Sequence, residues 1–144
     1  MKRVKRILSL ILVLVMLLGF APAAFASSAA FTDVAPNAWF YEAVNWAVKN
    51  GITTGVGAGL FAPGNTCTRA QVVTFLWRSQ GEPRPTSTNN PFVDVKESDY
   101  FYDAVLWAVE NGITGGTGAD TFSPDADCTR AQVVTFLYRF IKGQ

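Results

Sequence analysis

The 144-residue sequence contains no histidine and only two cysteines. Histidine is the commonest general base and the commonest metal ligand in proteins, and a catalytic nucleophile needs a base to activate it. Two cysteines are too few for a disulfide framework. These absences argue against an enzyme, and we expect no catalytic residue, no cofactor and no metal site.

Long apolar runs are absent except near the N-terminus. There, four basic residues precede an almost purely apolar stretch at residues 7–20, and residues 24–26 provide an A-x-A cleavage pattern. This arrangement predicts a secretory signal peptide over residues 1–26. An uncleaved anchor is the less favoured alternative, because a membrane span needs about 20 apolar residues. We therefore expect a secreted chain that has no membrane contact after cleavage.

Positive charge is scarce in the rest of the chain. All 11 acidic residues follow the predicted signal peptide, but only 8 of the 12 basic residues do, which leaves a net charge of −3. A nucleic-acid or anionic-membrane surface needs clustered Lys and Arg, so neither is an expected partner. Any anion that this chain binds must be held by local geometry.

The sequence is an internal duplication with an offset of 61 residues. Residues 31–79 align with 92–140 without a gap, about 30 of the 49 positions are identical, and CTRAQVVTFL occurs twice. Such self-similarity predicts two copies of one supersecondary unit.

The segment between the two copies has the composition of a linker. Residues 81–91 contain three prolines and a polar run, which disfavour a helix and favour an extended connection. We therefore predict one unit over residues 27–80 and a second over residues 92–144.

Each unit is expected to form two helices around a glycine-rich loop. The spacing of apolar residues from Phe40 to Ala47 predicts a helix with one buried face, which Asn50-Gly51 ends. The matching helix of the second unit is expected to begin at Ser98 or Asp99 and to end at Asn111-Gly112. The predicted fold class is all-α, built from tandem helix–loop–helix units.

The second helix of each unit begins inside the repeated decapeptide. Thr68-Arg69-Ala70-Gln71 fits the capping box S/T-x-x-E/Q, and Thr129-Arg130-Ala131-Gln132 repeats it. Both arginines then occupy the first helical position, where the helix dipole disfavours a cation by a few tenths to about 1 kcal/mol. A bound anion would compensate for this, because open amides and the guanidinium would converge on it.

An internal partner would serve the two arginines equally well. Asp33 and Asp94 are nearby acids that could pair with them, and an aromatic ring could lie under each guanidinium. The sequence alone leaves the bound anion and the internal partner as equal alternatives.

Three other features have simpler interpretations. Cys67 precedes the capping box, where a small apolar plug is expected, so two separate buried thiols are favoured over a disulfide with Cys128. Trp46 and Trp107 lie in the apolar helical stripes and are expected in the core. The acidic residues near Asp125 are interpreted as a solvated loop, because their spacing does not fit a calcium-binding loop.

The ordered motifs resemble the S-layer homology (SLH) repeat. They are F-x-D-V, an aromatic residue at Trp39 or Tyr100, a helix that ends in N-G-I, G-x-G-x-x-x-F-x-P, and T-R-A-Q. The resemblance covers both copies and nearly all of the chain after the predicted signal peptide. The family pattern usually has glutamate where Gln71 and Gln132 stand, and an aliphatic residue in place of each cysteine. Glutamine keeps the capping box.

The resemblance implies non-covalent anchoring to the bacterial cell wall or cell surface, as in S-layers. SLH domains bind secondary cell-wall polysaccharides, often ones that carry pyruvate ketals, and the motif arginine is thought to contact the pyruvate carboxylate. The residues so implied at the glycan site are Arg69, Arg130, Trp39, Tyr100, Asp33, Asp94, Gln71, Gln132, Gly55, Gly57, Gly116 and Gly118.

The number of repeats departs from the family pattern. SLH repeats usually occur in threes as a pseudo-trimer with grooves between repeats, so two repeats would form a partial pseudo-trimer with one internal groove. Its two exposed flanks would favour self-association or docking on other SLH proteins. The alternative is a fragment of a longer gene. The competing function is a structural module that assembles with other SLH proteins without binding glycan.

Overall fold

The computed structural model describes residues 31–143, so the predicted signal peptide lies outside the described part. This part contains four helices and no sheet: α2 (Tyr41–Lys49), α3 (Arg69–Ser79), α4 (Tyr102–Glu110) and α5 (Arg130–Lys142). The structure is therefore mostly helical, as predicted. None of the described helices has the length and apolar character needed to cross a membrane.

The capping boxes at the starts of α3 and α5 are both formed. Gln71 N donates to Thr68 Oγ1 at 3.2 Å, and Thr68 N donates to Gln71 Oε1 at 3.0 Å. The matching bonds of Thr129 and Gln132 measure 3.3 and 2.8 Å. Each arginine consequently occupies the first position of its helix, as predicted.

The ends of α2 and α4 also agree with the prediction, but the start of α4 does not. Gly51 and Gly112 follow the two helices with φ of 71° and 66°, the left-handed conformation that glycine adopts at little cost. The residue that precedes α4 is Phe101, which makes no side-chain cap. Asp99 instead accepts from Lys96 N at 2.8 Å and closes a turn before the helix.

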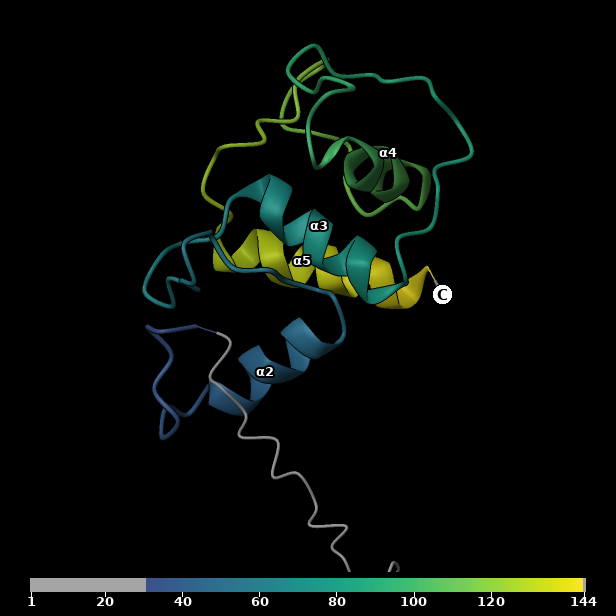
Figure 1. Ribbon diagram of the computed structural model, residues 1–144. Helices are drawn as coiled ribbons and strands as arrows, with labels where there is room; N and C mark the ends of the chain where they lie inside the picture. Colours follow the sequence, from purple (N-terminus) through teal and green to yellow (C-terminus); the bar gives the residue numbers. More distant parts are fainter. Residues whose placement is uncertain (1–30, 144) are drawn as a thin grey trace, which may run out of the picture.

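The first repeat contributes its second helix to the core of the second repeat. Helix α3 packs on α4, which lies above it in Figure 1, and the guanidinium carbon of Arg69 at the start of α3 lies 5.3 Å from the ring centre of Phe136 on α5. An antiparallel bridge between Thr68 and Asp127 brings the starts of these two helices together. Residues of both repeats therefore share one hydrophobic core: Ala70, Val72, Val73, Leu76, Trp77, Phe92, Val95, Phe101, Ala104, Val105, Trp107, Ala108, Ile113, Phe122 and Phe136.

Helix α2 has no comparable partner in the described part, and one core prediction is wrong for this reason. Trp107 on α4 is 6% exposed, as expected of a core residue, but Trp46 on α2 is 59% exposed. Helix α3 covers α4, whereas no helix takes the same place over α2 (Figure 1). Trp107 also packs on Phe140 of α5, with ring centres 6.2 Å apart, whereas the equivalent residue of the first repeat is Ser79. Equivalent residues thus differ in burial because their surroundings differ.

The cysteines are also placed differently from the prediction. Cys67 is exposed rather than a buried plug, and Cys128 is half-buried against the core. Both thiols are free, although Cys128 N donates to the carbonyl oxygen of Cys67 at 2.9 Å. Cys67 lies beside an open cavity, whereas Cys128 packs against the core, so the two equivalent thiols differ in exposure.

Candidate functional site

Arg69 is buried in the interface between the two repeats, with 3% of its surface exposed. Its Nε donates to the carbonyl oxygen of Phe122 at 2.9 Å, and its Nη2 lies 3.5 Å from Thr114 Oγ1. The guanidinium carbon also lies 5.0 Å from the ring centre of Phe122 and 5.3 Å from that of Phe136. Burial lowers the pKa of Arg69, but a guanidinium keeps its charge in proteins.

Arg130 occupies the same motif position in the second repeat, but its surroundings differ. It is exposed, and within the described residues its side chain has no hydrogen-bond or ion-pair partner. Of the internal partners considered for the arginines, the aromatic ring is the one found at Arg69. Asp33 and Asp94 make no hydrogen bond to either guanidinium.

The two aspartates close the glycine-rich loops of their own repeats. Asp33 accepts from Phe61 N at 2.9 Å and from Ala62 N at 2.7 Å, one bond for each carboxylate oxygen. Asp94 accepts from the corresponding amides of Phe122 and Ser123, both at 2.8 Å. The hydrogen bond from Phe61 N is the main cause that lowers the pKa of Asp33. Each carboxylate therefore holds in place the loop of its own repeat that contains two of the predicted site glycines, Gly55 and Gly57 in the first repeat and Gly116 and Gly118 in the second.

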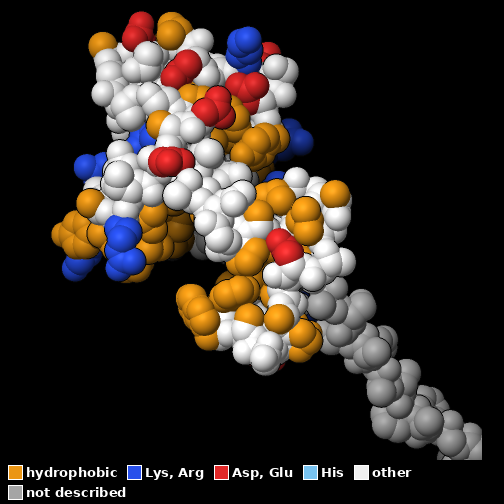
Figure 2. Space-filling view, turned by 90° about the vertical axis from the view of Figure 1, so that its left-hand side faces the viewer, with side chains coloured by type: hydrophobic (Ala, Val, Ile, Leu, Met, Phe, Trp, Pro, Cys, Tyr) orange, Lys and Arg blue, Asp and Glu red, His pale blue; other side chains and the backbone are white. Residues whose placement is uncertain are grey.

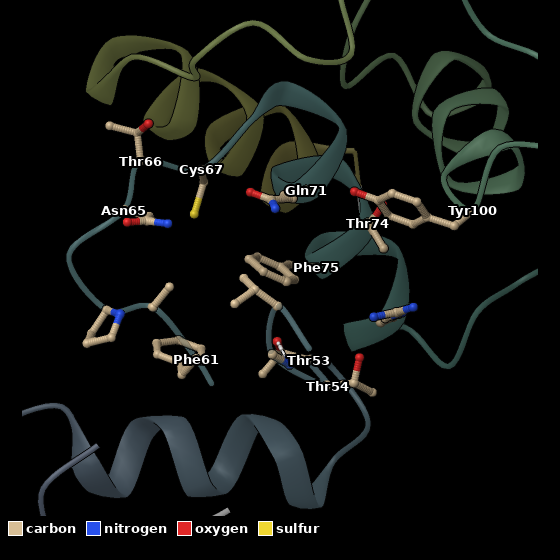
Figure 3. Close-up of a pocket in the computed structure, with 15 residues that line it drawn as sticks. Thr53, Thr54, Phe61, Asn65, Thr66, Cys67, Gln71, Thr74, Phe75 and Tyr100 are labelled. Carbon is tan, nitrogen blue, oxygen red and sulfur yellow. Dashed lines mark hydrogen bonds between the residues drawn. The ribbon is translucent and has the colours of Figure 1, made fainter. Parts of the chain in front are cut away.

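A cavity of about 490 Å³ opens beside the loop of the first repeat. We call it the first-repeat cavity. Figure 3 shows Phe61 below it, Gln71, Thr74 and Phe75 of α3 facing it, and Tyr100 of the second repeat reaching in from the side. Its lining residues are Thr53, Thr54, Gly55, Val56, Phe61, Ala62, Pro63, Asn65, Thr66, Cys67, Gln71, Thr74, Phe75, Arg78 and Tyr100. The cavity brings together three predicted site residues, one of them from the neighbouring repeat.

A second cavity, of about 510 Å³, lies at the matching place in the second repeat. We call it the second-repeat cavity, and it brings together the predicted residues Arg69, Gly116 and Gln132. Eight lining residues stand 61 positions after residues of the first-repeat cavity: Thr114, Gly115, Gly116, Thr117, Gln132, Thr135, Phe136 and Arg139. The duplication has therefore preserved a cavity as well as a helical unit.

Sequence reasoning missed one arginine in each cavity. Arg78 Nη1 lies 3.5 Å from the carbonyl oxygen of Ile52, and Arg139 Nη1 donates to that of Ile113 at 3.2 Å. Arg78 Nε is buried without a hydrogen bond, 3.4 Å from a carboxylate oxygen of Glu82. These arginines lie in the last turns of α3 and α5, where the helix dipole favours a cation. Their position in the sequence therefore does not indicate that they line a cavity.

The predicted aromatic residues differ in their access to the cavities. Tyr100 lines the first-repeat cavity, and partial burial raises the pKa of its hydroxyl while the nearby charge of Arg78 opposes this. Trp39 is 94% exposed and lies outside both cavities. It forms part of an apolar hollow of about 420 Å³ on the face of α2.

The predicted glycines are explained largely by contacts within the chain. A Cβ at Gly116 would lie 2.5 Å from the carbonyl oxygen of Thr121, and one at Gly55 would meet the Leu60 carbonyl and the Phe31 ring. Gly57 and Gly118 line neither cavity. The structure therefore accounts for Gly55 and Gly116 without a ligand.

Comparison with known proteins agrees with the motifs described above. Residues 30–73 and 91–134 each match the S-layer homology domain. A cell surface protein of Thermoanaerobacter kivui is 28% identical over 143 residues, covering 96% of this chain and 19% of that protein. An endoglucanase of Bacillus sp. strain KSM-635 is 30% identical over 146 residues, covering 96% of this chain and 15% of that protein.

A shorter match adds a third kind of relative. A cellulosome-anchoring protein of Acetivibrio thermocellus is 32% identical over 91 residues, covering 61% of this chain and 20% of that protein. The chain thus spans a fifth or less of the length of these three relatives, and the endoglucanase matches in its SLH region. The two domain matches cover more than half of the sequence, and the chain belongs to the S-layer homology domain family.

Proposed function

We propose that this chain anchors non-covalently to the bacterial cell surface by binding an anionic secondary cell-wall polysaccharide. The observation that carries the proposal is the recurrence of one cavity in both repeats, with an arginine, a glutamine and a threonine at matching positions. Two of the relatives, a cell surface protein and a cellulosome-anchoring protein, support a place at the cell surface. An anchoring module of this kind is a binding protein and not an enzyme.

The first-repeat cavity has the chemistry that an acidic sugar requires. Arg78 supplies the positive charge, and a guanidinium recognises a carboxylate such as that of a pyruvate ketal through paired hydrogen bonds. Gln71 offers its side-chain amide nitrogen to a sugar hydroxyl, because the capping box uses only its Oε1. Tyr100 offers a ring face and a hydroxyl from the opposite wall. Concave sites that combine apolar walls with a few convergent polar groups are the usual form of small-ligand sites.

The motif arginines have different roles in this proposal. Arg69 lines the second-repeat cavity, and Nη1 is the one guanidinium nitrogen that its two internal bonds leave over. Arg130 is exposed and is proposed as a carboxylate partner on the outer face of the second repeat. Trp39 is a proposed stacking surface at the edge of α2, and Gln132 completes the second-repeat cavity. The aspartates and the glycines of the predicted site act by shaping the loops.

The test is binding of the purified chain to cell-wall sacculi before and after removal of the secondary polymer. The variant Arg78→Ala/Arg139→Ala is compared with Lys49→Ala/Lys142→Ala, which removes the same charge from exposed positions. Tyr100→Ala tests the opposite wall without altering an arginine, and circular dichroism checks that each variant is folded. Polymer-dependent binding that is lost in the arginine and tyrosine variants but kept in the control supports the proposal.

The competing function is a module that joins other SLH proteins without glycan. The exposed apolar residues of α5 favour it, because such patches mark protein contacts. Binding to sacculi that survives polymer removal, and that the cavity variants leave unchanged, would support this alternative and contradict glycan recognition.

A further inference from the structure

Equivalent faces of α3 and α5 differ sharply in exposure. Val73, Leu76 and Trp77 on α3 are 0%, 9% and 9% exposed, because they pack on the second repeat. The residues 61 positions later on α5, Val134, Leu137 and Tyr138, are 60%, 39% and 63% exposed. Arg69 and Arg130 show the same contrast. Helix α5 therefore presents to solvent the surface that α3 uses to dock.

The surface that receives α3 also has an empty counterpart. The apolar hollow on the face of α2 is lined by Trp39, Phe40, Ala43, Val44, Ala47, Ile52, Thr53, Phe61, Pro63 and Phe75. The residues 61 positions after several of these, including Thr114, Phe122 and Phe136, are the ones that hold Arg69. The first repeat thus keeps the receiving site, but no helix of the described chain fills it.

The backbone groups at the two sites are matched in the same way. Arg69 N donates to Ala126 O at 2.9 Å, and Ala70 N donates to Pro124 O at 3.1 Å. The equivalent donors, at Arg130 and Ala131, make no hydrogen bond within the described residues. The equivalent acceptors, the carbonyl oxygens of Asn65 and Pro63, receive none there. A complete set of donors and acceptors therefore remains unpaired at two separate places on the chain.

We propose that a second copy of this chain docks head to tail, with the start of its α5 in the apolar hollow of the first. Its Arg130 would bond to the carbonyl oxygen of Phe61 and to Thr53, over the ring of Phe75, as Arg69 does in the second repeat. The docking stretch at residues 128–137 is identical, letter for letter, to the stretch at 67–76 that already docks within the chain. This identity is the reason for assigning the site to a second copy.

The two complementary surfaces are both accessible. Figure 2 shows one hydrophobic patch with basic side chains at the lower left, over α5, and another lower on the molecule, over the first repeat. In a head-to-tail pair, the α5 surface of one copy and the apolar hollow of the other copy remain free. Further copies can therefore add until the assembly closes. Docking would move Arg130 from the outer face, where the free chain offers it to a carboxylate, into the first-repeat cavity of the next copy, which it would line as Arg69 lines the second-repeat cavity.

The test is the mass of the purified chain by analytical ultracentrifugation over a wide range of concentration, without any glycan. We expect the weight-average mass to rise at least to that of a dimer. Arg130→Glu should keep the chain monomeric, whereas Lys142→Glu, the same charge change on the same exposed helix, should leave association unchanged. Because no polymer is present, this result is independent of whether the proposed glycan function holds.

A mixing experiment tests the head-to-tail arrangement. Phe75→Lys places a cation where the docked Arg130 would lie, so this variant alone should also be monomeric, with circular dichroism checking its fold. Mixed with Arg130→Glu, it should form heterodimers, because one chain supplies an intact Arg130 and the other an intact hollow. A wild-type chain that stays monomeric, an Arg130→Glu chain that associates like wild type, or a mixture that forms no heterodimer would overturn the proposal.

Discussion

Arg69 Nε in the first repeat lies 2.9 Å from the carbonyl oxygen of Phe122 in the second, 53 residues further along the chain. This bond joins the start of α3 to the glycine-rich loop of the other repeat, beneath two aromatic rings. In a site that excludes water, each of these contacts stabilises the guanidinium more than the same contact would at the surface. The first motif arginine therefore stabilises the repeat interface, whereas the second is free for an external partner.

Replacing Gly116 by alanine is expected to destabilise the second repeat. Its φ is 87°, and a Cβ would lie 2.5 Å from Thr121 O and 2.6 Å from the ring of Phe92. We expect Gly116→Ala to lower the free energy of unfolding by more than about 1 kcal/mol, measured by urea denaturation. Gly64→Ala, where a Cβ would meet no atom within 4 Å, is the control and should change it by less than about 0.5 kcal/mol.

Acid should weaken the first repeat through Asp33. Backbone hydrogen bonds, chiefly from Phe61, lower its pKa in the folded state below the ordinary 3.8. A carboxylate with a depressed pKa contributes stability that is present above its unfolded pKa and is lost as the pH falls below 3.8 through the folded value. Asp33→Asn should flatten the acid limb of the stability–pH curve, measured by urea denaturation. Asp103→Asn, at an exposed carboxylate without a hydrogen bond in the described part, should not.

The linker is expected to lose protection when Glu110 is removed. The carboxylate of Glu110 accepts from Thr86 N at 3.0 Å and from Ser87 N at 2.5 Å. These two hydrogen bonds lower the pKa of Glu110, and the bond from Thr86 has the larger effect. Hydrogen–deuterium exchange of Glu110→Ala should be several-fold faster at residues 86 and 87 and unchanged in α3. Equal exchange in the variant and the wild type would mean that the linker is held by other contacts.

The two thiols should react at different rates. Cys67 is exposed, whereas Cys128 is half-buried and burial raises the pKa of its thiol. Alkylation proceeds through the thiolate, so iodoacetamide should modify Cys67 several-fold faster at mildly alkaline pH. Mass spectrometry of peptides from a time course gives the two rates. Faster modification of Cys128 would show that the repeat interface opens readily.

The sequence predicts local structure well here because local structure depends on neighbouring residues. The capping boxes at Thr68 and Thr129 involve residues three positions apart, and the stops at Gly51 and Gly112 depend on one residue each. All four are found as predicted. The start of α4 differs from the prediction because Asp99 closes a turn with Lys96, three residues before it, in place of capping the helix.

The burial of equivalent residues could not be predicted from the repeat, because it depends on which unit has a neighbour. Trp46 and Trp107 stand at the same position in the same pattern, yet α3 covers only the second of the two helices, and only Trp107 has an aromatic partner, Phe140 of α5. The cavity arginines Arg78 and Arg139 were overlooked for a different reason. A cation is favourable at the end of any helix, so only the cavities themselves draw attention to them.

The different roles of the two motif arginines are tested by comparing the stabilities of Arg69→Ala and Arg130→Ala, determined by urea denaturation at a concentration where the chain is monomeric. The loss of charged hydrogen bonds and ring contacts predicts that Arg69→Ala lowers the free energy of unfolding by about 3 kcal/mol. Arg130→Ala, at an exposed site, should change it by less than about 0.5 kcal/mol. Equal losses in the two variants would contradict the assignment of different roles to the two matching arginines.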